Sequence, residues 1–342
     1  MTAYFIRRLL LIIPTFIGIT VMVFAITRFV PGGPVERILM EANLAGGEGQ
    51  ATIQQTGGAG GGSLSEAQIE QLKAYYGLDK PVVISYGLWL VKVITGDLGR
   101  STRFNEPVWT TIQDRLPVSI FYGVATLIIT YLISIPLGVV KAIRHQTRLD
   151  TISSLIVFIG YAIPGFVVGI VLIALFAFQL EWFPLSGFVS DDFDDFTLGQ
   201  QILDVLWHAT LPLMAYVAGS FAVMTFMMKN ALLENLAADY IRLAMAKGAS
   251  FRHAVFKHAF RNSLIPLATH FGNNISIVLT GSFLIETIFN IDGFGLLGYE
   301  SILYRDYPVV MGILVISALL YLVGNILSDV CVAWVDPRVQ FN

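Results

Sequence analysis

Six segments of this sequence are apolar over twenty residues or more, and this pattern restricts the fold more than any other feature. A helix needs about 20 mostly apolar residues to cross the hydrocarbon core of a membrane. The segments cover residues 9–30, 117–140, 152–178, 207–228, 267–289 and 308–332. Only 13% of the 342 residues are charged, roughly half the share of a soluble domain. We therefore predict an all-α polytopic membrane protein with six transmembrane helices.

The distribution of charge predicts the orientation of these helices. With the N-terminus inside, the segments that face the cytoplasm are 1–8, 141–151, 229–266 and 333–342. Together they carry twelve Lys or Arg residues and four acidic residues. The outer segment 179–206 carries six acidic residues and neither Lys nor Arg. Because cytoplasmic loops are enriched in Lys and Arg, both termini are expected in the cytoplasm.

A further apolar stretch, residues 82–94, is too short to be a seventh span and contains Lys92. Counting it as a span would move the basic segment 229–266 to the outside. We predict instead an interfacial helix, with Tyr86 and Trp89 at the depth of the lipid headgroups.

Four prolines predict kinks in the spans: Pro14, Pro136, Pro164 and Pro212.

The spacing of the apolar segments divides the chain into three parts. Residues 1–116 are expected to form the first helix and a long periplasmic segment, in which residues 46–63 contain eight glycines. Such a composition gives a flexible linker that cannot bury a core. Residues 65–68 (SEAQ) are a capping box, which predicts a short helix. Residues 117–332 are expected to form a five-helix core, and residues 333–342 a short cytoplasmic tail.

The longest inner segment, residues 229–266, is patterned as two short helices. Residues 238–247 are helix-prone, and Gly248 is placed to end that helix in a left-handed conformation. Ser250 is placed to cap a second helix. Apolar residues recur at helical spacing in that second helix and are expected on its buried side: Phe251, Ala254, Val255 and Ala259. The segment suits a solvated loop that sets the orientation, a surface that binds anionic lipid, or a docking element for a soluble partner.

The stretch Arg242 to Gly248 reads RLAMAKG, and Pro266 follows eighteen positions later. It resembles the coupling loop of permease subunits of ATP-binding-cassette (ABC) importers, whose general motif is Glu-Ala-Ala-x-x-x-Gly. Arg242 and Leu243 replace the Glu and the first Ala of that motif, and this form is similar to the peptide-transporter branch. The resemblance implies that residues 239–262 dock on an ATPase subunit, with Gly248 as the bend. It assigns the docking helix to Arg242, Leu243, Ala244, Met245, Ala246 and Lys247.

Other motifs extend the resemblance over nearly the whole chain. They include Arg7-Arg8, Pro31 to Pro34 (PGGP), Tyr76 to Pro81 (YGLDKP), Gly96 to Ser101 (GDLGRS), Arg305 to Pro308 (RDYP) and Asp336 to Arg338 (DPR). These are similar to signatures of oligopeptide and dipeptide permeases, and the long segment after the first span is typical of the first permease of the pair. Gly160 to Pro164 and Gly295 to Glu300 look most like the Yej-type permease, which is associated with oligopeptides and microcin C.

The resemblance implies the type I fold of ABC importer permeases and a set of partners. The chain would form half of an inner-membrane pore with a second, homologous permease. A periplasmic binding protein would deliver peptide, and a cytoplasmic ATPase would hold ATP and Mg. Membrane lipid is the remaining expected partner, and no nucleic acid is expected. We expect neither a cofactor, a metal site nor an enzymatic activity on this chain, because its residues form no nucleophile–base pair, metal-ligand pattern or complete Walker motif.

Three polar residues lie on one face of the predicted span 267–289. His270, Asn273 and Asn274 are spaced at i, i+3 and i+4. They either line a pathway or form hydrogen bonds between helices. The alternative function is an ion-coupled secondary transporter of a small solute, which needs a carboxylate near the middle of the membrane or inverted repeats. The sequence has neither in evident form, and this favours the ABC permease.

Overall fold

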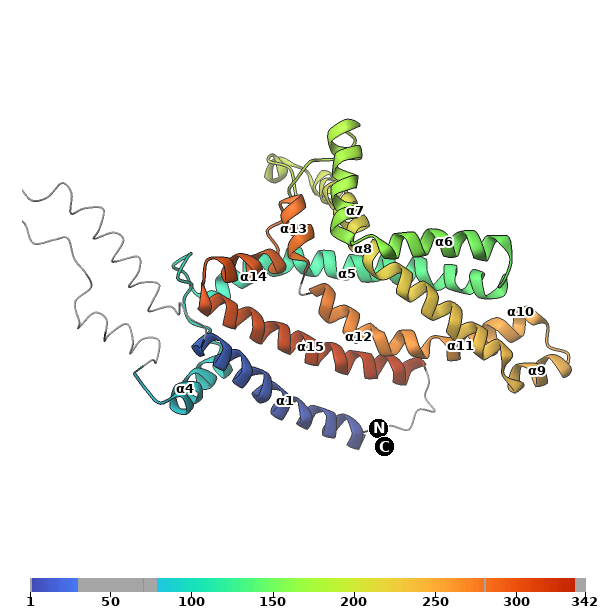
Figure 1. The fold of residues 1–342 in the computed structure, drawn as a ribbon, viewed down its shortest axis with the longest axis horizontal. Coiled ribbons are helices and arrows are strands. Elements are labelled where there is room, and N and C mark those ends of the chain that lie inside the picture. The colour runs from blue at the N-terminus through green and yellow to red at the C-terminus, as the bar shows by residue number, and fades with distance from the viewer. Residues whose placement is uncertain (1, 30–69, 71–78, 280, 336–342) are drawn as a thin grey trace, which may run out of the picture. The chain divides into compact units, whose positions relative to one another are not determined.

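The computed structural model describes residues 2–29, 70, 79–279 and 281–335. The predicted glycine-rich linker at 46–63, the capping box at 65–68 and the tail beyond residue 335 lie outside this part. The described residues are helical without a named β-strand, apart from an isolated bridge between Arg100 and Pro107. The predicted all-α class is therefore confirmed (Figure 1).

The chain divides into two compact units. Unit 1 consists of residues 1–11, 115–297 and 319–342, and unit 2 consists of residues 12–114 and 298–318. Four helices contain residues of both units, namely Thr2–Phe29, Val108–Ile143, Phe294–Leu303 and Tyr307–Val335. The longer elements are α1 (Thr2–Phe29), α4 (Val82–Ile94), α5 (Val108–Ile143), α6 (Arg148–Ala162), α7 (Gly165–Leu172), a π-helix (Ile173–Gln179), α8 (Leu198–Ala237), α12 (Ile265–Leu279), α13 (Phe283–Phe289), α14 (Phe294–Leu303) and α15 (Tyr307–Val335).

In unit 2, the predicted short helix at 82–94 forms as α4 and packs against α1. The ring of Phe24 lies 5.6 Å from the rings of both Tyr86 and Trp89, centroid to centroid. The hydroxyls of Thr20 and Tyr86 are 3.0 Å apart. Part of the surface of Tyr86 and Trp89 is therefore in contact with α1. The unit also contains a loop in which the Asp306 carboxylate accepts hydrogen bonds from Ser101 Oγ and from the backbone amides of Thr102 and Arg103.

The predicted set of six spans is confirmed only in part. Among the described residues, four helices are long and apolar enough to cross a membrane: residues 6–25 of α1, and α5, α8 and α15. A fifth span is formed if α6 and the helix that begins with α7 are counted together. These two helices meet at a bend of 94°.

Two of the predicted spans are interrupted. The span predicted at 152–178 breaks before Pro164, where Ile163 is extended with φ −94° and ψ 121°. A residue before proline is disfavoured in the helical conformation, which explains the break. The span predicted at 267–289 is split into α12 and α13 at Gly281, whose φ is +73°. By contrast, Pro14, Pro136 and Pro212 lie inside helices.

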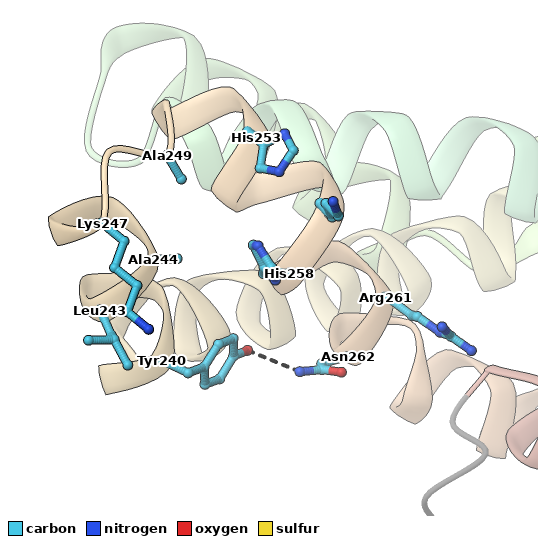
Figure 2. Close-up of a pocket in the computed structure, with 10 residues that line it drawn as sticks. Tyr240, Leu243, Ala244, Lys247, Ala249, His253, His258, Arg261 and Asn262 are labelled. Carbon is cyan, nitrogen blue, oxygen red and sulfur yellow. Dashed lines mark hydrogen bonds between the residues drawn. The ribbon is translucent and has the colours of Figure 1, made fainter.

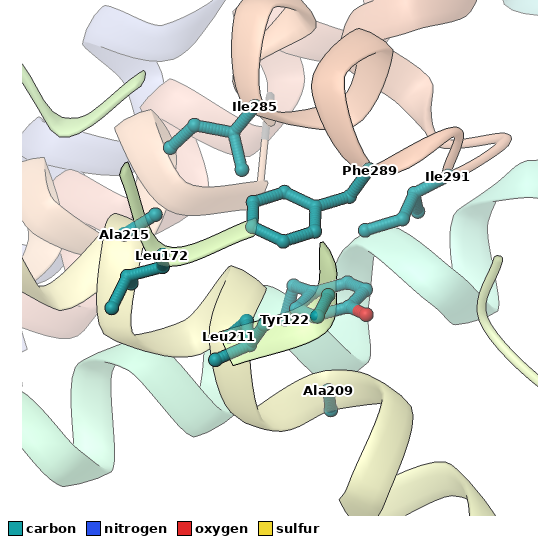
Figure 3. Packing of buried hydrophobic residues seen from close by; sticks show 9 residues of the cluster. Tyr122, Leu172, Ala209, Leu211, Ala215, Ile285, Phe289 and Ile291 are labelled. Carbon is teal, nitrogen blue, oxygen red and sulfur yellow. The ribbon is translucent and has the colours of Figure 1, made fainter. Parts of the chain in front are cut away.

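The core of unit 1 lies where α7, α8 and α13 pack beside α5 (Figure 3). Tyr122, Ala215 and Phe289 are each at most 2% exposed. The remaining buried members of this cluster are Leu172, Ala177, Ala209, Leu211, Ile285 and Ile291. This packing fixes the segments that follow the two breaks, α7 and α13, to the long helices α5 and α8.

Candidate coupling site

The basic segment after α8 folds as the predicted helix–glycine–helix. The first helix, α9, covers Asp239–Ala246. Gly248 follows with φ +91°, the left-handed conformation predicted for it. Its N–H donates to the carbonyl of Met245 at 2.9 Å, and the Ala249 N–H donates to the carbonyl of Ala244 at 3.1 Å. These bonds satisfy carbonyls at the end of the helix, as is usual for this type of helix terminus.

The second helical stretch runs through α10 (Phe251–His253), a π-helix (Ala254–Ala259) and α11 (Phe260–Ser263). Ser250 Oγ accepts a hydrogen bond from the His253 N–H at 3.3 Å, so the predicted cap is confirmed. Ala254, Val255 and Ala259 are fully buried, as predicted. The prediction was wrong for Phe251, which is 46% exposed. Helical side chains tilt toward the N-terminus, so the first residue of this helix extends past the covered turn.

Buried contacts anchor α9 to the long helices. Ile241 is only 2% exposed and belongs to one apolar cluster with Met228 and Leu232 of α8 and Val139 of α5. Ala254 and Ala259 of the second helix belong to the same cluster. Because protein interiors are close-packed, this cluster ties α9 firmly to α5 and α8.

The other side of the two helices faces a cavity of about 820 Å³ (Figure 2). Its basic residues are Lys247, His253, Lys257, His258 and Arg261, and none of the acidic residues that the structure describes lines it. Tyr240, Leu243, Ala244, Ala249 and Asn262 complete the lining. The surface is therefore concave and basic.

Two polar contacts hold this cavity in shape. Asn262 Nδ2 donates to the Tyr240 hydroxyl at 3.2 Å, and that hydroxyl donates to Asn235 Oδ1 at 2.6 Å. These bonds connect the second helix to α9 and to α8. Arg261 Nε donates to the carbonyl of Val335 at 2.7 Å, which adds the end of α15.

The predicted docking residues are accessible. Arg242, Leu243, Met245, Ala246, Lys247 and Gly248 are exposed, and Ala244 is half-buried. Leu243 and Met245, at 56% and 44% exposure, add two large apolar side chains to the basic surface. Arg242 lies 3.5 Å from Asp239, but both side chains are largely exposed, so this pair contributes little to stability.

Two cations that the sequence assigned to inner loops are buried inside helices. Lys141 in α5 is fully buried, and Lys229 in α8 is 9% exposed. Lys229 Nζ lies 2.8 and 2.9 Å from the two carboxylate oxygens of Asp150, and Lys141 Nζ lies 3.3 Å from one of them. Lys141 also donates to the hydroxyls of Ser153 and Ser154. In the sequence, the one indication of this cluster is Asp150, an acidic residue within the basic inner segment 141–151.

The three polar residues of α12 have different surroundings. Asn274 Nδ2 donates to the Tyr131 hydroxyl of α5 at 3.2 Å, which is an interhelical hydrogen bond. Asn274 also lines a cavity together with Tyr131. His270 is exposed and is not among the residues that line this cavity. The side chain of Asn273 lies outside the described side chains.

The chain thus combines long apolar helices with a basic two-helix loop that is anchored on one face and accessible on the other. The chain belongs to the family described as binding-protein-dependent transport system inner membrane component, which matches residues 134–341. This membership does not favour the ion-coupled secondary transporter considered above.

Full-length relatives show which permeases the chain resembles. The chain is 42% identical over 362 residues to the inner membrane ABC transporter permease protein YejB of Escherichia coli O157:H7, with 100% of both chains covered. It is 41% identical over 362 residues to the peptidoglycan transport system permease protein YejB of Agrobacterium fabrum, covering 100% of this chain and 99% of the relative. It is also 36% identical over 344 residues to the oligopeptide transport system permease protein AppB of Bacillus subtilis, again over 100% of both. The resemblance to Yej-type and peptide permeases is confirmed.

Proposed function

We propose that this chain is one permease subunit of an ATP-driven inner-membrane importer of oligopeptides or peptide-like compounds. The observation that carries the proposal is the two-helix loop, whose buried face joins α5 and α8 and whose open face is basic and accessible. The substrate class rests on the relatives, which are named as dipeptide, oligopeptide and peptidoglycan transport system permeases.

The proposed arrangement has six transmembrane helices, type I topology and both termini in the cytoplasm. To reach six, α6 with the helix after it and α12 with α13 each count as one interrupted span. A second, homologous permease completes the pore, and a periplasmic binding protein delivers peptide. ATP and Mg belong to a cytoplasmic ATPase, on which residues 239–262 dock.

In this mechanism the chain transmits movement and carries out no chemistry. When the ATPase closes, it displaces α9 through contacts with Leu243, Met245 and the basic residues that line the cavity of about 820 Å³. Ile241 lies in close contact with Met228 and Leu232, so α8 moves together with α9. Packing of Val139 in the same cluster extends the displacement to α5. The pore would thereby change from one access state to the other.

A strain that lacks this chain tests the function. Its uptake of labelled oligopeptides of several lengths, and of microcin C, is expected to fall to background and to return when the chain is restored. Uptake that persists without the chain, or that is insensitive to depletion of ATP, would contradict the proposal.

The acidic outer loop gives a further prediction. Asp191, Asp192, Asp194 and Asp195 are all exposed, and Asp204 is instead buried in α8, where its carboxylate accepts hydrogen bonds from Ser190. Either the four aspartates are merely solvated, or they attract a basic surface on the binding protein or on cationic peptides. In the second case, replacing all four with Asn should slow uptake roughly 3- to 10-fold at low ionic strength and leave the maximal rate nearly unchanged, because salt screens such steering.

Glu181→Gln, which removes one exposed charge from the same loop, is the control and should have little effect. Uptake is measured at two salt concentrations with neutral and cationic peptides. Equal rates for the fourfold variant and the unchanged chain at low salt would leave the aspartates as solvated residues only.

A further inference from the structure

Unit 1 contains a second cavity, of about 380 Å³, between the long helices. It is lined by residues of α5, α7, α8, α12 and α13, and so lies away from the coupling loop. A volume of this size is within the range of small-molecule binding sites. The function proposed for the coupling loop does not account for this cavity, because no residue of that loop lines it.

The lining of the cavity is mostly apolar, with a few hydroxyl and amide groups, and the described residues contribute no charged side chain to it. Thr130 and Ser220 face each other, with their hydroxyl oxygens 3.2 Å apart. Asn274 reaches the Tyr131 hydroxyl from the opposite helix. Hydroxyl and amide groups both donate and accept hydrogen bonds. Such a lining complements a neutral ligand with alternating donors and acceptors, which is the chemistry of a peptide main chain.

One lining group has unmet hydrogen-bonding capacity. Thr126 is 2% exposed, and its hydroxyl oxygen has no hydrogen-bond partner in the described part of the chain. Leaving a buried hydroxyl unpaired is unfavourable. A threonine in a helix has two accessible side-chain rotamers, so rotation can exchange its methyl and hydroxyl at the cavity wall. A polar occupant would then satisfy this hydroxyl.

The wall on the α13 side is fixed by Glu286. This carboxylate is 2% exposed and accepts hydrogen bonds from the Tyr216 hydroxyl and from the backbone N–H groups of Ser282 and Leu296. Tyr216 and Ser282 both line the cavity. Glu286 therefore acts as a positioning residue, since protein donors behind the wall hold its carboxyl group.

We propose that this cavity is a substrate subsite in the transmembrane core, which holds a peptide segment with neutral side chains through its main-chain amides. The inference rests on the proposed function and specifies where the substrate is contacted. In this subsite Thr126, Ser220 and Asn274 form hydrogen bonds with the peptide. Gly219 leaves room for it, because it has no side chain.

Two glycines of α8 allow a matched test. A Cβ at Gly219, which lines the cavity, would meet no atom within 4 Å, and the same is true of Gly199, which lies outside it. In the complete transporter, reconstituted with its partner subunits, Gly219→Leu should fill the cavity. Uptake of triphenylalanine is expected to fall at least 10-fold and that of trialanine less than 2-fold. Gly199→Leu should change neither.

Thr126→Val provides the second measurement, because it keeps the volume and removes the hydroxyl. Loss of one hydrogen bond to an uncharged group predicts a roughly 3- to 10-fold higher KM at unchanged maximal rate. Normal kinetics in both Gly219→Leu and Thr126→Val would overturn the subsite. Failure of Gly219→Leu to assemble with the partner subunits would also overturn it, because the cavity would then receive a partner helix. If the unchanged transporter moves no peptide, the proposed function itself fails.

Discussion

Gly248→Val is expected to abolish peptide uptake while the chain still inserts into the membrane and assembles with its partners. The backbone at Gly248 has φ +91°, and a Cβ there would meet no atom within 4 Å. The effect therefore comes from the backbone conformation alone. A β-branched residue in this region is strained by about 1–3 kcal/mol, so the chain would relax by changing the angle between α9 and the following helix.

Gly96→Val is the matched control for this prediction. Gly96 has φ +83°, and a Cβ added there would also meet no atom within 4 Å, but it lies in the other unit, after α4. Both variants carry similar backbone strain, and only Gly248→Val alters the proposed docking surface. The readouts are peptide uptake and the stimulation of ATP hydrolysis by the loaded binding protein. Normal uptake by Gly248→Val, or an equal loss in both variants, would remove the coupling role.

Local features of the fold could be predicted from the sequence because they depend on neighbouring residues. Gly248 and Ser250 mark a helix end and a helix start within three positions, and both are found where they were expected. The short helix at 82–94 was likewise bounded by its own apolar pattern. In each case the chemistry that sets the boundary is contained within one turn of helix.

The interrupted spans could not be predicted from hydropathy, because an average over about twenty residues does not register the conformation of one residue. Residues 267–289 read as one mostly apolar segment, yet Gly281 has a positive φ between two helices, and Glu286 accepts a hydrogen bond from the Ser282 N–H before the second of them. Pro164 was predicted to kink its span, and the 94° bend exceeds a kink because Ile163 leaves the helix altogether.

The buried charges could not be predicted for a different reason. Asp150 and Lys229 are 79 residues apart, so their pairing depends on how α6 packs against α8. A count of charges per loop places both Lys141 and Lys229 in water at the membrane surface. In the structure they are held by one carboxylate inside the helical bundle, next to the cluster that anchors the coupling loop.

Asp150→Asn is expected to be severely destabilising, because it leaves two buried ammonium groups without an opposing charge. Lys141 and Lys229 are 0% and 9% exposed, and Asp150 is 4% exposed. Removing one partner of a buried ion pair typically costs about 3–5 kcal/mol. The chain should be much less abundant in membranes, and the purified complex should unfold at a clearly lower temperature.

Two further variants separate charge balance from the general effect of a substitution. Lys141→Met leaves Lys229 paired with Asp150, one cation to one anion, and so should be tolerated better than Asp150→Asn. Asp239→Asn removes a carboxylate from an exposed pair, whose side chains are 97% and 74% accessible, and should change stability by less than about 0.5 kcal/mol. The expected order of destabilisation is Asp150→Asn, then Lys141→Met, then Asp239→Asn, measured by membrane abundance and by thermal unfolding. If Lys141→Met were as damaging as Asp150→Asn, the cluster would depend on its hydrogen bonds to Ser153 and Ser154, and the imbalance of charge would not be the cause.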